Sequence, residues 1–110
     1  MNNSPILELT VEELKQKMDA KEKFCLLDVR EPQENQICKI PESKLIPLKE
    51  LPSRLNELNA SDQIVVYCHS GNRSARAVKF LRENHFTNSS NLIGGISAWA
   101  ERIDPSMPTY

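Results

Sequence analysis

The sequence lacks any long apolar run and any large excess of charge. No stretch approaches the roughly 20 apolar residues that a membrane-spanning helix requires, which excludes a membrane-embedded protein. Fourteen basic and fifteen acidic residues leave a formal net charge of -1, and neither sign forms a long block. This balance argues against nucleic acid and against a membrane surface as partners.

The sequence also lacks internal repeats and low-complexity segments. Its 110 residues suffice for one ordinary domain with one core, but not for two. We therefore predict a single domain over residues 1–110, with a small molecule or a protein as its partner.

Cysteine is scarce, and its pattern excludes two further classes. Cys25, Cys38 and Cys68 make an odd number and lack metal-ligand spacing, so we expect no metal site. Residues 1–5 lack the charged and apolar regions of a secretory signal peptide. We expect a soluble protein of the reducing cytoplasm.

The apolar pattern predicts two well-defined helices and two well-defined strands. Thr10 followed by Glu13 forms a capping box, after which apolar residues recur at helical spacing. Two apolar runs do not alternate with polar residues, which indicates strands covered on both faces. The predicted helices cover 11–20 and 74–83, and the predicted strands cover 24–29 and 63–67.

Weaker signals complete the pattern. They predict a loop over 30–41, a short strand at 44–46 and a helical stripe over 48–58 that Pro52 interrupts. A strand at 91–93, a Gly94-Gly95 turn and a helix over 96–102 follow. Strands alternating with helices predict an α/β fold with a mostly parallel central sheet and helices on both faces. Ligands of such sheets collect beyond the carboxyl ends of the strands. Both Asp28 and Cys68 fall at such ends.

The loop that starts at Cys68 is the main functional signal. A thiol between a strand end and a helix start faces free backbone N–H groups and the positive end of the helix dipole, which favour the thiolate. Gly71 permits the backbone to curl into an anion-binding cup, and the Arg73 guanidinium at the rim is suited to an oxyanion. The alternatives are an inert buried cysteine and a solvated arginine that opposes the helix dipole.

Loop length separates two chemistries of a thiolate in such a cup: attack on phosphorus and attack on a sulfane sulfur. Thiol-dependent phosphatases resemble one another in having five residues between cysteine and arginine, whereas four lie between Cys68 and Arg73. The smaller cup suits one added sulfur atom.

Four segments, in order, resemble the motifs of the rhodanese (sulfurtransferase) family. They are Asp28-Val29-Arg30-Glu31-Pro32 with Glu34, Ile40-Pro41 followed by Ile46-Pro47-Leu48, Cys68 to Ser74, and Gly94-Gly95-Ile96-Ser97-Ala98-Trp99. The ending, 104–108, is similar to the rhodanese modules that follow ubiquitin-activating-like adenylyltransferase domains in sulfur-carrier pathways. Two departures are Cys38-Lys39, where the family usually has Gly-His, and His85, where a glycine often ends the helix.

The resemblance implies the rhodanese fold and a double-displacement mechanism. The Cys68 thiolate attacks the outer sulfur of thiosulfate, or of a protein persulfide, and expels sulfite or a thiol. The persulfide then passes its terminal sulfur to cyanide, a thiol or a sulfur-carrier protein. No metal or organic cofactor is needed, and an adenylyltransferase is an implied partner.

The other loop residues are predicted to bind substrate. The side chain of His69 shapes access to the cup, and Asn72 belongs to the loop that surrounds the sulfur. The Ser70 and Ser74 hydroxyls donate to the persulfide, although Ser74 is equally suited to be a helix N-cap.

Two residues outside the loop are weaker predictions. Asp28 accepts hydrogen bonds from the loop or pairs with Arg73, unless it is an ordinary strand-end aspartate in a turn. Arg30 lines the entrance and attracts anionic donors. Cys25 is expected in the core, and Cys38 is either a bystander or a second thiol that resolves the persulfide.

Two alternative functions remain open. One is a cysteine phosphatase or arsenate reductase on the same fold. The other is a rhodanese-like interaction module that docks a partner without catalysis.

Overall fold

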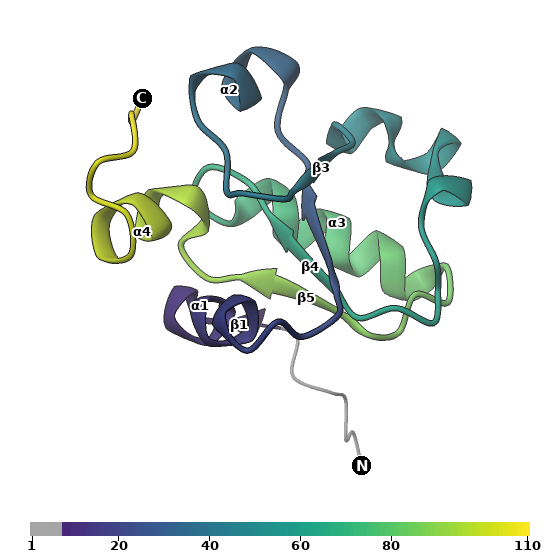
Figure 1. Cartoon of the computed structure of the whole chain (residues 1–110). Coiled ribbons are helices and arrows are strands. Elements are labelled where there is room, and N and C mark those ends of the chain that lie inside the picture. The colour runs from purple at the N-terminus through teal and green to yellow at the C-terminus, as the bar shows by residue number, and fades with distance from the viewer. Residues whose placement is uncertain (1–7) are drawn as a thin grey trace.

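The computed structural model describes residues 8–110, and Figure 1 shows the path of the chain. The predicted α/β fold is confirmed. Along the chain the elements are β1 (Glu8–Leu9), α1 (Val11–Asp19), β2 (Cys25–Asp28), α2 (Pro32–Ile37), β3 (Lys44–Leu45), the 3-10 helices η1 (Leu48–Ser53) and η2 (Leu55–Glu57), β4 (Ile64–Tyr67), α3 (Asn72–Glu83), β5 (Ser89–Leu92) and α4 (Gly95–Arg102).

The five strands form one parallel sheet in the order β1-β5-β4-β2-β3. The two predicted apolar strands, β2 and β4, lie side by side at its centre, with Cys25 opposite Ile64 and Asp28 opposite Tyr67. Parallel strands end at the same edge of a sheet, so Asp28 and Cys68 emerge there together. This edge is where the sequence placed the site.

Each face of the sheet carries its own core. Leu27 and Val66 point to the face covered by α3 and η1, whereas Leu26 and Val65 point to the face covered by α1 and α4 (Figure 1). Neighbouring residues of one strand thus enter different cores, which explains why both strands are continuously apolar. Burying each such side chain stabilises the fold by about 1.5–3 kcal/mol.

The capping box of α1 is confirmed. The Glu13 N–H donates to Thr10 Oγ1 over 3.1 Å, and the Thr10 N–H donates to Glu13 Oε1 over 2.8 Å. These two bonds satisfy N–H groups that have no partner inside the helix, which fixes where α1 begins.

The structure departs from the sequence predictions at three places. The predicted loop over 30–41 contains α2, whose signals were Pro32 in the first turn and a capping box between Glu31 and Glu34. The predicted helical stripe over 48–58 is made of two short 3-10 helices that meet at Arg54, and Pro52, which lacks an N–H group, lies inside the first. Strand β1 was not predicted because two residues are too few to show a period.

Two further expectations concern His85 and the N-terminal residues. His85 follows α3 with φ 74°, the left-handed conformation for which glycine is usual, as its sequence position suggested. Residues 1–5, on which the prediction about a signal peptide rests, lie outside the described residues. No helix within 8–110 has the length and apolar character needed to cross a membrane.

Candidate active site

Cys68 directly follows β4, and its side chain is 1% exposed. Its Sγ accepts the N–H of Gly71 over 3.1 Å and the N–H of Ser74 over 3.4 Å, and lies 3.3 Å from Ser74 Oγ. Helix α3 begins at Asn72, so the sulfur also lies at the positive end of the helix dipole. The loop therefore forms a cup of hydrogen-bond donors around one sulfur atom.

This cup stabilises the thiolate. Burial alone would raise the pKa of the Cys68 thiol, but hydrogen bonds from the Ser74 hydroxyl and from the N–H groups of Ser74, Gly71 and Ser70 outweigh it, so the pKa lies below its ordinary 9.0. Burial and the charge of Asp62 raise the pKa of the Cys25 thiol instead. Of these two thiols, only that of Cys68 lies in a setting that favours the thiolate.

Gly71 gives the loop its curvature. Its φ of 115° is unfavourable for residues with a Cβ atom, whereas the space around it would admit one, since the nearest atom to that Cβ would be 3.7 Å away. The Asn91 side chain donates from Nδ2 to the Gly71 carbonyl over 3.2 Å. Strand β5 thus stabilises the turn at Gly71 through the Asn91 side chain.

The N-terminus of α4 supports the loop from the other side. The N–H of Ile96 donates to the Cys68 carbonyl over 2.9 Å, and the N–H of Ser97 donates to the His69 carbonyl over 3.0 Å. A Cβ atom on Gly95 would lie 2.5 Å from the first of these oxygens and 2.6 Å from the second. The predicted Gly94-Gly95 turn is confirmed, and its second glycine allows α4 to bind loop carbonyls while loop N–H groups face the sulfur.

Arg73 is held by a partner that the sequence analysis did not assign to it. Its Nη1 and Nη2 donate to Glu34 Oε1 and Oε2 over 2.7 and 2.9 Å. The hydrogen bonds from Arg73 outweigh the effect of burial and, with those from the Glu31 N–H and the Tyr110 hydroxyl, lower the pKa of Glu34 to about 2. The sequence predicts a loop where α2 lies, so it gives no indication of this bidentate pair.

Arg30 does not line the entrance, and Asp28 neither contacts the Cys68 loop nor pairs with Arg73; it is a strand-end aspartate in a turn, whose Oδ1 accepts the Arg30 N–H over 2.9 Å. Both side chains are 0% exposed, and Arg30 donates from Nε and Nη2 to the two carboxylate oxygens of Asp28 over 2.9 and 2.8 Å. Arg30 also donates to the Cys38 carbonyl over 2.7 Å, and Asn35 donates to Asp28 over 3.0 Å. A buried guanidinium requires a paired carboxylate, so Asp28 pairs with Arg30 instead of Arg73. The bonds from Arg30 and Asn35 then fix the segment around α2.

The remaining loop residues differ in position. Ser74 is not the N-cap of α3, because Gly71 occupies that position and the Ser74 hydroxyl contacts the sulfur. Ser70 and Asn72 are exposed at the mouth of the loop. His69 is half-buried and stacks on Tyr110, with ring centroids 4.2 Å apart. Tyr110 had no recognisable signal in the sequence.

Neither of the other cysteines belongs to the cup around the Cys68 sulfur. Cys25 is half-buried and packs against the core beside α3, as predicted. Cys38 ends α2 and packs partly against the other core. Within residues 8–110, no group of three or more His, Cys, Asp and Glu side chains is placed to hold a metal ion.

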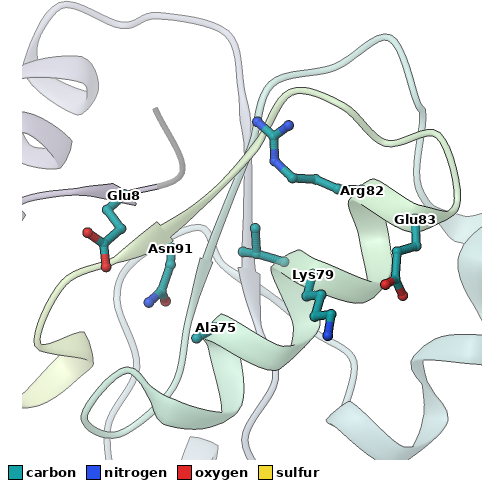
Figure 2. Close-up of a pocket in the computed structure, with 7 residues that line it drawn as sticks. Glu8, Ala75, Lys79, Arg82, Glu83 and Asn91 are labelled. Atoms are coloured by element: carbon teal, nitrogen blue, oxygen red, sulfur yellow. The ribbon is translucent and has the colours of Figure 1, made fainter. Parts of the chain in front are cut away.

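A groove of about 640 Å³, whose lining does not include Cys68, lies between α3 and strands β1 and β5 (Figure 2). In Figure 2, Lys79, Arg82 and Glu83 project from α3, and Asn91 projects from β5. Asn91 is therefore shared between this groove and the turn at Gly71, and its Oδ1 is buried without a hydrogen-bond partner among residues 8–110.

The sequence matches the model of the rhodanese-like domain family over residues 10–102. The chain belongs to this family. Its matches among solved structures include a rhodanese-like domain protein from Staphylococcus aureus, with a TM-score of 0.82, 31% identity and coverage of 96% of this chain and 99% of that one. They also include the human single-domain sulfurtransferase TSTD1, with a TM-score of 0.83, 25% identity and coverage of 89% and 98%.

Two curated relatives are longer proteins. The chain is 36% identical to the adenylyltransferase and sulfurtransferase MOCS3 of Arabidopsis thaliana, with 93% of this chain and 25% of that protein aligned. It is 39% identical to the putative sulfur carrier protein YrkF of Bacillus subtilis, with 94% of this chain and 56% of that protein aligned. The chain thus spans between a quarter and just over half of these relatives.

Proposed function

We propose that this protein is a sulfurtransferase that carries a sulfane sulfur as a persulfide on Cys68. The observation that carries the proposal is the cup: a buried sulfur with a lowered pKa that faces the N–H groups of Gly71 and Ser74 and the Ser74 hydroxyl. The same donors suit a persulfide, which is also a sulfur anion.

The proposed reaction has two displacements. In the first, the Cys68 thiolate attacks the outer sulfur of thiosulfate, a new S–S bond forms, and sulfite leaves with the electron pair of the broken S–S bond. In the second, a nucleophilic acceptor attacks the terminal sulfur and the Cys68 thiolate leaves, ready for another cycle. Cyanide, a thiol and a sulfur-carrier protein all meet this requirement, and a protein persulfide is an equivalent donor.

Arg73 is proposed to draw the anionic donor to the cup. Glu34 uses two of the five N–H groups of the guanidinium and fixes its plane, which leaves further N–H groups to bind a sulfonate oxygen. The side chain is 31% exposed, so an incoming donor can reach it. His69, Ser70 and Asn72 are proposed to form the surface that the donor or acceptor meets.

The names of the relatives support this proposal and extend it to partners. They include an adenylyltransferase and sulfurtransferase, a putative sulfur carrier protein and a single-domain sulfurtransferase. We propose a sulfur-carrier protein as the acceptor, an adenylyltransferase as the enzyme that cooperates with it, and the reducing cytoplasm as the compartment. The thiosulfate:cyanide reaction is the convenient assay for this activity.

One experiment tests the function. The protein is incubated with thiosulfate or with a protein persulfide, and intact mass and cyanide-dependent thiocyanate release are measured. The wild type and Cys25→Ser should gain one sulfur atom and release thiocyanate, whereas Cys68→Ser should do neither. Absence of mass gain on Cys68 with both donors would reject the proposal, and hydrolysis of an aryl phosphate abolished by Cys68→Ala would favour a phosphatase.

A further inference from the structure

The C-terminal tail brings Tyr110 to the edge of the active loop. The Tyr110 ring stacks on His69, the residue after Cys68, with an interplanar angle of 16° and a centroid distance of 4.2 Å. Its hydroxyl donates to Glu34 Oε2 over 2.8 Å and accepts from Arg30 Nη1 over 3.0 Å. The Tyr110 side chain thus contacts both His69 and Glu34, the residue that pairs with Arg73.

The Glu34 carboxylate shows what the Tyr110 hydroxyl does. Oε1 accepts from Arg73 and from the Glu31 N–H over 2.7 and 2.9 Å, and Oε2 accepts from Arg73 and Tyr110 over 2.9 and 2.8 Å. Each carboxylate oxygen therefore accepts one hydrogen bond from Arg73 and a second that holds the oxygen in place, from the Glu31 N–H for Oε1 and from the Tyr110 hydroxyl for Oε2. Without the hydroxyl, Oε2 loses its fixing bond and the plane of the Arg73 guanidinium is less strictly set.

The tail is attached well enough to hold this position. After α4, the N–H groups of Ile103 and Asp104 both donate to the Trp99 carbonyl, over 2.8 and 2.9 Å, and the Met107 N–H donates to the Asp104 carbonyl over 3.0 Å. Ile103 and Met107 also pack against the core beneath α4. Figure 1 shows the tail running from α4 to the side of α2.

We infer that Tyr110 is a positioning residue for anionic sulfur donors, which acts by holding His69 and, through Glu34, the guanidinium of Arg73 at the mouth of the cup. Tyr110 contacts His69, Glu34 and Arg30 but not the sulfur, so it acts on donor binding more than on the sulfur-transfer step. This inference rests on the proposed sulfurtransferase function for its substrate. Its geometric part, the orientation of Arg73 toward anions, is testable without sulfur transfer.

The kinetic test compares Tyr110→Phe and Tyr110→Ala with Thr109→Ala, an exposed neighbour in the same tail. Tyr110→Phe keeps the ring and loses the hydroxyl, so KM for thiosulfate should rise about two- to fourfold, and Tyr110→Ala should raise it about five- to tenfold. In both variants kcat should stay within about twofold, and Thr109→Ala should behave as wild type. In a Glu34→Gln background, which keeps a capping-box residue, Tyr110→Phe should have no further effect on KM.

A second measurement does not depend on sulfur transfer. Cys68 is alkylated with iodoacetate, which is anionic, and with iodoacetamide, which is neutral, and modification is followed on the Cys68 peptide by mass spectrometry. The rate constant for iodoacetate divided by that for iodoacetamide measures how strongly Arg73 attracts an anion to Cys68. It should fall about three- to tenfold in both Tyr110→Ala and Arg73→Ala and be unchanged in Thr109→Ala.

These outcomes separate the two proposals. An unchanged ratio in Tyr110→Ala, or in Arg73→Ala, overturns the positioning role whether or not the protein transfers sulfur. Equal effects of Tyr110→Phe with and without Glu34→Gln overturn the route through Glu34. A falling ratio in a protein that takes no sulfur on Cys68 supports the positioning role and rejects the proposed function.

Discussion

The N–H of Ile96 donates to the carbonyl oxygen of Cys68 over 2.9 Å, and thereby joins the first turn of α4 to the proposed sulfur-carrying residue. The two residues are far apart in the sequence and meet only because β5 lies beside β4 in the sheet. Helix α4 thus supports the active loop while the loop N–H groups turn inward.

Gly95→Ala should damage this contact. The residue has φ 59°, and the new Cβ would lie 2.5 Å from the Cys68 carbonyl, so α4 and the loop must separate. We expect a loss of about 2–3 kcal/mol in the free energy of unfolding and a higher pKa of the Cys68 thiol. Urea denaturation and the pH dependence of Cys68 alkylation measure the two effects.

Gly94→Ala is the matched control for that variant. Its Cβ would meet the Cβ of Ala98 within α4 rather than a loop carbonyl. It should lower stability while leaving the pKa of the Cys68 thiol close to wild type. Equal effects of both substitutions on alkylation would show that α4 does not shape the cup.

Ser74→Ala should make the Cys68 thiol less reactive. The hydroxyl lies 3.3 Å from Sγ and helps to lower the pKa of that thiol against the effect of burial. Alkylation of Cys68 by iodoacetamide at pH 7 should slow about three- to tenfold. Cys25, whose pKa is raised, provides an internal reference in the same peptide map and should not change. An unaltered Cys68 rate would assign the lowered pKa to the backbone N–H groups alone.

The pair between Glu34 and Arg73 should make stability depend on pH in acid. Folding lowers the pKa of Glu34 from its ordinary 4.5 to about 2, so the carboxylate contributes stability above about pH 4.5 that is lost as the pH falls toward 2. After allowance for solvent screening, this contribution is about 1–2 kcal/mol. The free energy of unfolding of wild type minus that of Glu34→Gln, measured by urea denaturation, should shrink between pH 5 and pH 2.5. A constant difference would contradict the pairing.

Arg30→Met should destabilise the segment around α2. The substitution leaves the buried Asp28 carboxylate without its guanidinium, at an expected cost of about 3–5 kcal/mol in the free energy of unfolding. Arg76→Met, on the exposed surface of α3, is the control and should change stability little. Normal stability of Arg30→Met with weakened thiosulfate binding would restore the entrance role that the sequence had indicated.

The sequence determined the central features of this protein because they depend on local order. The apolar runs of β2 and β4 specify strands covered on both faces, and Cys68 and Gly71 specify a curled turn between a strand and a helix. A thiolate in a cup of N–H groups follows from those residues alone. The rhodanese motifs, read in order, were enough to predict the family that the comparison then showed.

Only the tertiary structure decided which charged and aromatic side chains meet. Arg73 pairs with Glu34 across 39 positions of sequence, and Tyr110 reaches Glu34 across 76. Asp28 is taken by Arg30 because a fully buried guanidinium cannot remain unpaired. Sequence spacing indicates which elements form, but partners distant in the chain are set by how those elements pack around the sheet.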